Sequence, residues 1–193
     1  MTMSRGRDVF NKYKKLLDWG ARYYGVLPRK LRLQIWNRIC DKKGKLRIAQ
    51  RYMLLKSLAS SVGSNVSIHD HVYLFHIENM EFGDNVSIHP MCYLQGSGGI
   101  KIGNDVSIAH GVTIMTENHA FCDLGTPIKD QEVIKKEIVI SNNVWIGAKA
   151  TILYGNNIKE GAIVAANAVV TKDVQENAIV AGVPAVIVKN RVQ

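Results

Sequence analysis

The strongest constraint on the fold is an aliphatic residue that recurs about every six positions between Val62 and Val170. Apolar residues on one face of an amphipathic helix recur at spacings of three and four, so a period of six is not helical. Each hexad is instead typical of one short strand followed by a corner. The register runs through Phe82, Ile88, Leu94, Ile102, Ile108, Ile114, Ile140, Ile146, Ile152, Ile158, Val164 and Val170.

The corners are predicted by the small and polar residues that follow the aliphatic ones. Residues 83–88, 103–108 and 141–146 are close to copies of one another, and each begins with Gly or Ser and then Asn or Asp. Gly and Asn accept positive backbone φ at little steric cost. Three strands per coil would bury the aliphatic side chains along one axis, with coils stacked ~4.8 Å apart. We therefore expect a mainly β fold of stacked parallel coils rather than an antiparallel sandwich with coincidental spacing.

Length and composition limit the class of protein. The chain has 193 residues, enough for one main domain with a sizeable core. The first ten residues contain Arg5, Arg7 and Asp8 and lack the apolar run of a signal peptide. No stretch approaches the roughly 18 apolar residues of a membrane span. The 3 cysteines show neither the spacing of a zinc site nor the even count of a disulfide framework. We expect a reduced, cytoplasmic protein.

Positive charge is concentrated at the N-terminal end. Residues 1–61 hold 16 Lys and Arg against 3 Asp, a formal charge of +13, whereas the other residues hold 9 against 13 acids, a charge of −4. Pro28 suits the first turn of a helix, and the apolar residues after it recur at helical spacing. We expect a basic α-helical segment over residues 1–61 and a repeat domain over residues 62–191.

Two roles are compatible with the basic segment. It can cover the open end of the stack, with its apolar side packed on the repeats. It can also lie on the inner face of an anionic membrane, because Trp19, Tyr23, Tyr24 and Trp36 accompany the basic residues. Peripheral membrane contact would suit a substrate held on a lipid carrier. No motif for nucleic-acid binding accompanies the charge, so nucleic acid is not predicted as a partner.

The repeat is interrupted after Ile114 and resumes near Ile138. Residues 116–137 are expected to form an irregular loop that projects from the stack. Loops longer than ~15 residues in a regular domain are often functional. This loop carries a histidine, His119, close to its start. We therefore expect chemistry at the interruption.

Five features in order resemble the hexapeptide-repeat acetyltransferases: the repeats, the His119 loop, and residues 144–148, 169–174 and 181–185. The most similar branch is that of the maltose and galactoside O-acetyltransferases and the sugar O-acetyltransferases of surface-polysaccharide biosynthesis. The resemblance covers residues 62–191. It implies a left-handed parallel β-helix, which departs from the usual right-handed crossover, and a homotrimer with active sites between subunits. It also implies acetyl-CoA as co-substrate, a sugar or glycan acceptor, and no metal.

The resemblance assigns the chemistry to two positions. His119 matches the catalytic histidine, which would take a proton from the acceptor as the acceptor attacks the thioester in a ternary complex. An imidazole with its ordinary pKa of ~6.5 suits this task. The backbone N–H of Ala148 matches the donor to the oxyanion. Glu117, Asn118 or a backbone carbonyl could orient the ring, and the alternative for His119 is a solvent-exposed loop histidine without a role.

Other matched positions imply how the substrates bind. For coenzyme A they comprise a tryptophan beside the pantetheine arm, small residues that leave room for it, and a pair at the nucleotide end, with two C-terminal cations as further partners. These residues are Trp145, Gly147, Ala148, Ala165, Ala166, Thr171, Lys172, Lys189 and Arg191. Asn118 and His89 are expected on the acceptor side. His89 falls near the family's acceptor-contacting asparagine, so a histidine there departs from the maltose and galactoside pattern.

Other activities stay open at this point. N-acetylation of an amino sugar would use the same base and donor, and serine or antibiotic acetylation is a further alternative. The γ-carbonic anhydrases bind a metal on the same prism with three histidines. Two of those ligands lie five residues apart, and here only His71 and His76 have that spacing, far from the loop. An inactive trimeric scaffold is disfavoured because His119, Trp145 and Lys172 are all present.

Overall fold

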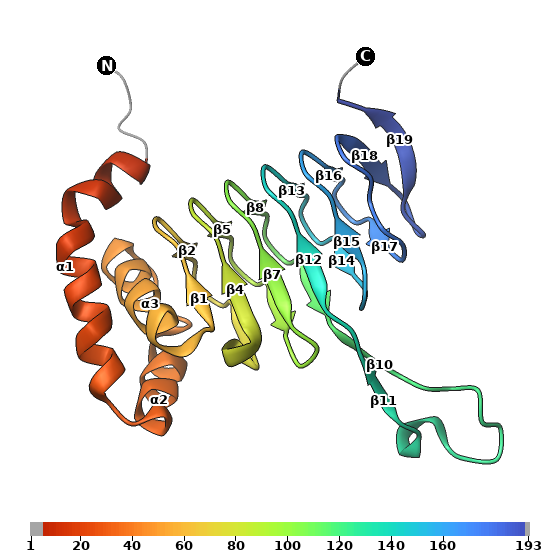
Figure 1. Ribbon diagram of the computed structural model, residues 1–193, viewed down its shortest axis with the longest axis horizontal. Helices are drawn as coiled ribbons and strands as arrows, with labels where there is room; N and C mark the ends of the chain where they lie inside the picture. The colour runs from red at the N-terminus through yellow and green to blue at the C-terminus, as the bar shows by residue number, and fades with distance from the viewer. Residues whose placement is uncertain (1–5, 192–193) are drawn as a thin grey trace.

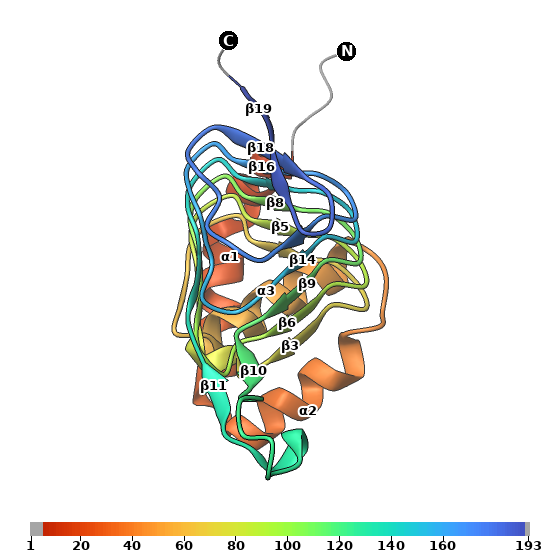
Figure 2. The ribbon, with the colours of Figure 1, turned by 90° about the vertical axis from the view of Figure 1, so that its right-hand side faces the viewer.

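A computed structural model describes residues 6–191 and shows a β-solenoid with helices at one end (Figure 1). The chain passes through three faces in each of about six turns, so neighbouring strands of a face come from successive turns and run parallel. Viewed along the solenoid, the turns lie over one another around a common core (Figure 2). The prediction of a mainly β, parallel, coiled fold is confirmed, and the left hand of the coil stays a prediction.

Three sheets form the faces, named here A, B and C. Face A contains β1 (Ser61–Val62), β4 (Met80–Phe82), β7 (Ile100–Ile102), β12 (Ile138–Ile140) and β15 (Asn157–Ile158). Face B contains β2 (Ser67–Ile68), β5 (Ser87–Ile88), β8 (Ser107–Ile108), β13 (Trp145–Ile146), β16 (Ile163–Val164), β18 (Ala178–Ala181) and the antiparallel β19 (Val186–Asn190). Face C contains β3 (Tyr73–Phe75), β6 (Tyr93–Gln95), β9 (Thr113–Met115), β14 (Thr151–Ile152) and β17 (Val169–Val170).

The hexad residues form the core of the solenoid. Every residue of the predicted register is buried, with an exposed fraction of 3% or less. On face A, Ile102 lies in register with Phe82 of the turn before and Ile140 of the turn after. Burial of one such side chain contributes about 1.5–3 kcal/mol. Because each turn buries the apolar rows of its neighbours, the stack is stabilised as a unit.

The corner between faces A and B explains the copied segments. Asn85, Asp105 and Asn143 have positive φ, of 58°, 57° and 55°. At Gly83 an added Cβ would lie 2.7 Å from the backbone of the next turn, so only glycine fits there. The corner role predicted for these polar residues is confirmed.

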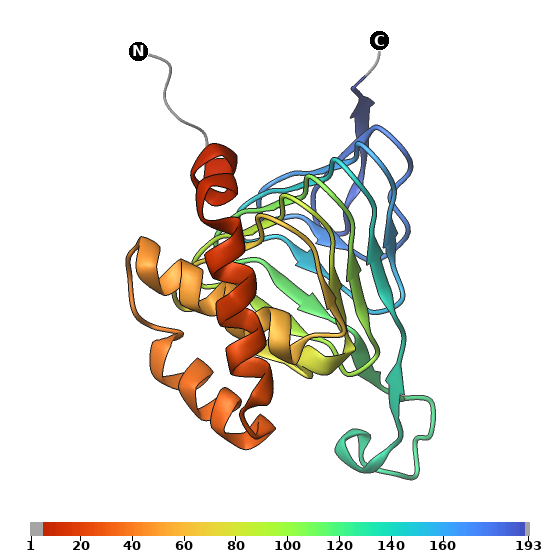
Figure 3. The same cartoon turned by 60° about the vertical axis from the view of Figure 1, so that its left-hand side comes forward.

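Three helices cover the N-terminal end of the solenoid (Figure 3). They are α1 (Gly6–Val26), α2 (Arg29–Ile39) and α3 (Lys45–Leu58). Leu54 and Leu55 of α3 are fully buried and belong to the same core as the first turn, and α1 packs on α3. The helical segment therefore covers the open end of the stack. Within residues 6–191, no helix has the length and apolar character that a membrane crossing requires.

The interruption of the repeat is more ordered than expected. Its two ends form an antiparallel hairpin of β10 (Glu117–His119) and β11 (Val133–Lys135), and a short 3-10 helix, η2 (Ile128–Asp130), lies between them. The hairpin projects away from the solenoid (Figures 1 and 2). Another 3-10 helix, η1 (Ile77–Asn79), precedes β4. The prediction of an irregular loop was therefore wrong at both ends of the segment. The sequence did not reveal the strand because Glu117, Asn118 and His119 lack the alternation of apolar residues that marks one.

Candidate active site

His119 lies at the end of β10, opposite Val133 of β11. Its side chain is exposed and makes no hydrogen bond to any group between residues 6 and 191. Glu117 lies on the same side of the strand, but its carboxylate accepts a hydrogen bond from the Ser97 hydroxyl at 2.7 Å. Asn118 is exposed on the other side of the hairpin. One chain therefore presents the histidine without a group that orients its ring.

In each coil of the solenoid, the residues that follow the face-B strand bend the chain toward face C. These bends stack into one continuous corner, which we call the B–C corner. Hydrogen bonds link the corner residues of successive coils, for example from the Asn167 N–H to the Ala148 carbonyl at 2.9 Å. The structure thus brings together the small residues that the sequence singled out, and it places His89 in the same row. In chain order the row contains His69, His89, Ala109, His110, Gly147, Ala148, Ala165 and Ala166.

The backbone N–H of Ala148 is available to an external acceptor. The next residue, Lys149, donates its N–H to the His110 carbonyl at 2.9 Å. The Ala148 N–H, in contrast, donates to no group in the described part of the chain. An amide fixed by its neighbours and free of an internal partner is the type of group that stabilises a developing oxyanion.

Gly147 has a structural reason to be glycine. A Cβ at this position would lie 2.5 Å from the Ala166 nitrogen and 2.8 Å from the Ala165 carbonyl carbon. Its φ is not positive, so the requirement comes from the close approach of the next turn. Gly147 therefore allows the turns to stack, whereas Ala148, Ala165 and Ala166 are the residues with small side chains that are at least partly exposed.

Trp145 lies on the outer side of face B, in register with Ser107 and Ile163 of the adjacent turns. Its side chain is 54% exposed, so it does not belong to the core. The His119 hairpin leaves the solenoid after face C and points away from it (Figures 1 and 2). A whole face therefore separates the base of the hairpin from the B–C corner, and one chain does not bring its own His119 to its own Ala148.

The residues predicted to contact the nucleotide of coenzyme A lie in two places. Thr171 and Lys172 are exposed directly after β17 of face C. Lys189 lies in β19 of face B, where it lines a shallow depression of about 350 Å³ together with Arg191. The Arg191 guanidinium donates to the Gly161 carbonyl at 2.8 Å, so it has a structural partner. The structure does not bring Lys172 and Lys189 together.

A histidine that the sequence analysis left unassigned lies against His89. The rings of His69 and His89 are stacked, with centroids 4.9 Å apart and an interplanar angle of 8°. Burial, together with the charge of His89, lowers the pKa of His69 below its usual value. The signal was present in the sequence, because residues 65–69 and 85–89 are both Asn-Val-Ser-Ile-His and lie in register. In residues 6–191, no three His, Cys, Asp or Glu side chains gather in a way that could hold a metal ion.

Comparison with known proteins places this geometry among acetyltransferases. No family model matches the chain. Galactoside O-acetyltransferase of Escherichia coli (strain K12) is 29% identical over 147 residues, which are 74% of this chain and 69% of that protein. A probable acetyltransferase of Mycobacterium tuberculosis is 39% identical over 74 residues, 38% of this chain, and the match spans 25% of that protein. A solved hexapeptide-repeat acetyltransferase of Vibrio cholerae, complexed with acetyl-coenzyme A, is 26% identical with a TM-score of 0.74, over 93% of this chain and 89% of that chain.

Proposed function

We propose that the chain is a hexapeptide-repeat acetyltransferase, like the relatives and solved structures it resembles, and that it transfers an acetyl group from acetyl-CoA to a hydroxyl of a sugar or saccharide precursor. The observation that carries the proposal is the B–C corner, where a row of small side chains adjoins the unpaired Ala148 N–H and continues to the histidine pair. The extended pantetheine arm of coenzyme A would lie along Ala165 and Ala166. The acetyl-CoA complex of the Vibrio cholerae neighbour supports this donor.

His119 would act as the general base. A ring nitrogen accepts the proton of the acceptor hydroxyl while the hydroxyl oxygen attacks the thioester carbonyl carbon. The negative oxygen of the tetrahedral intermediate accepts a hydrogen bond from the Ala148 N–H. When the C–S bond breaks, the imidazolium returns the proton to the departing thiolate. The acetyl group passes directly from donor to acceptor, and no acyl-enzyme forms.

We place this site between two copies of the chain in a homotrimer. His119 lies on a hairpin that points away from the solenoid (Figure 2), and its ring has no hydrogen-bond partner within residues 6–191. In a cyclic assembly the hairpin of one copy can reach the B–C corner of the next, and the contact repeats three times. The neighbouring copy would then supply both the oxyanion donor and the group that orients the ring.

The acceptor would bind at the histidine end of the corner. Imidazole nitrogens both donate and accept hydrogen bonds, so the stacked His69 and His89 can recognise sugar hydroxyls. Asn118, next to His119, would provide a second contact. The galactoside O-acetyltransferase relative supports a sugar acceptor. We propose a precursor of a surface polysaccharide, modified on the cytoplasmic side of the membrane.

The direct test follows the release of free CoA thiol from acetyl-CoA across a panel of sugars, sugar nucleotides and amino sugars. Acceptor-dependent release is expected with a hydroxyl acceptor, and analysis of the product distinguishes an ester from an amide. His119→Ala should abolish release while acetyl-CoA binding is retained. Equal release by wild type and variant would refute the assignment of His119, and an amide product would replace O-acetylation with N-acetylation of an amino sugar.

A further inference from the structure

Helix α1 has one broad apolar surface, and only part of it is covered. Its inner part, with Leu17 and Ala21 buried, packs against α3. The outer part is uncovered, and its large apolar side chains are 41% to 85% exposed. The outer stripe consists of Val9, Tyr13, Leu16, Trp19, Tyr23 and Val26.

Aromatic rings dominate the middle of the outer stripe. Trp19 and Tyr23 stack with ring centroids 6.3 Å apart, and they are 66% and 61% exposed. Such a contiguous exposed apolar patch marks an interaction surface. Tryptophan and tyrosine combine an apolar ring with a polar group and are enriched where a membrane meets water.

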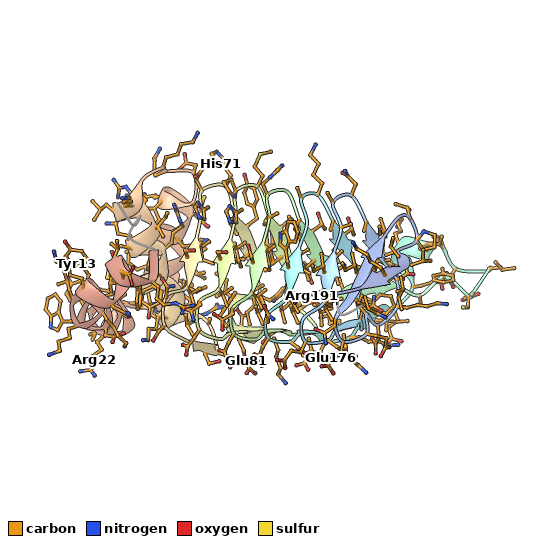
Figure 4. The ribbon with its side chains drawn as sticks, turned by 90° about the horizontal axis from the view of Figure 1, so that it is seen from above. Tyr13, Arg22, His71, Glu81, Glu176 and Arg191 are labelled. Atoms are coloured by element: carbon orange, nitrogen blue, oxygen red, sulfur yellow. The ribbon has the colours of Figure 1, made fainter. Side chains whose placement is uncertain are left out.

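Unpaired basic side chains border the outer stripe. Lys15 and Arg22 are exposed, and neither forms a salt bridge with a carboxylate in the described part of the chain. Lys14, on the inner side, is instead paired with Asp18 at 2.7 Å. Figure 4 shows Tyr13 and Arg22 extending outward at the helical end of the molecule. The surrounding segment of residues 1–61 has a formal charge of +13, from 16 Lys and Arg against 3 Asp.

We propose that the outer stripe of α1 docks onto an anionic lipid membrane, with the helix lying in the plane of the interface. A lipid surface supplies both an apolar layer for the rings and negative charge for the lysines and arginines. A second copy of α1 would bring two strongly positive segments together, so self-association through this surface is disfavoured by charge. If the enzyme is the cyclic trimer of the proposed function, three such helices face the same side, and their combined binding exceeds that of one.

Flotation of the full-length protein with vesicles tests the proposal. We expect binding to vesicles of phosphatidylcholine mixed with phosphatidylglycerol, little binding to pure phosphatidylcholine, and weaker binding as salt is raised. The triple variant Leu16→Ser, Trp19→Ser, Tyr23→Ser should lose at least ~10-fold in vesicle affinity. The matched control is Leu124→Ser, which removes a side chain that is 99% exposed at the hairpin and should bind as wild type does.

Two further measurements keep this result separate from the acetyl transfer. CoA release with a free acceptor should be unchanged in the triple variant, which shows that the variant is folded and that membrane docking is a distinct property. Absence of vesicle binding by wild type, or equal binding by the triple variant, would overturn the proposal. Tight binding of a single-stranded RNA that the triple substitution leaves unchanged, without vesicle binding, would assign the charge to nucleic acid and would also overturn it.

Discussion

The first two turns of the B–C corner and its later turns share one backbone geometry but carry opposite kinds of side chain. His69 and His89 fill the corner in the first two turns with stacked rings. In the later turns Ala109, Gly147 and Ala165 occupy the same position and leave it almost bare. Because the hydrogen-bonded stack holds every turn in register, the difference lies in side chains alone. The same corner thus offers polar recognition at one end and room for an extended ligand at the other.

In the proposed function, each end of the B–C corner binds one substrate. The histidine end would bind the acceptor, the small-residue end would bind the donor, and His119 of a neighbouring copy would act between them. Substitutions at one end should therefore change the binding of one substrate and leave the other unaffected. The following predictions use that separation, from the largest expected effect to the smallest.

Removal of the base should abolish the transfer step and leave the binding of both substrates unchanged. We expect His119→Ala to lower kcat by about 10²- to 10⁴-fold, the usual contribution of a general base. The Kd for acetyl-CoA should stay within about twofold of the wild-type value, less than 0.5 kcal/mol. Steady-state kinetics and calorimetry measure the two quantities.

The control for this prediction is His76→Asn. His76 is exposed and has a positive φ of 58°, a conformation that asparagine tolerates. It should retain wild-type kcat. A comparable loss of activity in both variants would show that His119 has no special role.

Filling the small-residue end should block the donor. Ala166 is exposed, so Ala166→Trp should fold, but its ring would occupy the volume proposed for the pantetheine arm. Overpacking costs about 1–3 kcal/mol, so the Kd for acetyl-CoA should rise roughly 10- to 100-fold. Ala166→Ser should bind acetyl-CoA as wild type does. Unchanged donor binding in the tryptophan variant would place coenzyme A elsewhere.

Loss of the lysine at the far end of the donor should have a smaller effect. Lys172→Ala should raise the KM for acetyl-CoA by about tenfold, since a hydrogen bond to a charged phosphate contributes about 1.5–3 kcal/mol and solvent reduces that value at an exposed site. Lys172→Arg should recover part of the loss. Lys159→Ala, at an exposed lysine on face A, is the control. Equal KM values for Lys172→Ala and Lys159→Ala would contradict the assignment.

The histidine end should make the fold sensitive to mild acid. Burial and the charge of His89 lower the pKa of His69 in the folded state, so the unfolded chain binds the proton more readily. The free energy of unfolding should therefore decrease as the pH falls below ~6.5, the unfolded value. Denaturant titrations at several pH values give the free energy of unfolding at each pH. This free energy should fall less steeply with decreasing pH for His69→Gln than for wild type.

Asp18 acts in a lower pH range. Its pKa is lowered by its hydrogen bonds to Lys14 and Lys56, so its contribution to the free energy of unfolding is lost only in stronger acid.

Sequence predicted the solenoid well because its register is local and repeated. Ile88, Ile108 and Ile146 recur at fixed spacing, and that spacing alone determines which side chains point inward. Two features were not predicted, for physical reasons. The hairpin depends on backbone pairing of the polar strand β10 with β11, and the requirement for Gly147 depends on the distance to the next turn.

The candidate site was predicted only in part. The small residues and His89 converge on one corner because the repeat places them there, and His69 could have been added from the repeated Asn-Val-Ser-Ile-His segment. In the proposed arrangement the site combines two copies of the chain, so no pattern in a single sequence positions His119 against Ala148. The aromatic residues of the helical segment were also predicted only in part: Trp19 and Tyr23 are exposed as membrane contact requires, whereas Trp36 is buried and Tyr24 packs against the core. A broad apolar surface on a helix does not by itself indicate which part packs.

Complementation between two impaired variants tests the central claim most directly, namely that each site combines the His119 of one copy with the B–C corner of another. Chains carrying His119→Ala and chains carrying Ala166→Trp are co-expressed in equal amounts, purified together and assayed at an acetyl-CoA concentration far below the Kd of either protein, where each variant alone has little activity. If the site lies between copies, random trimers regain about a quarter of the wild-type sites, because one neighbour pair in four combines an intact base with an intact corner. Activity no higher than that of the separate variants would contradict the claim and place the whole site within one chain.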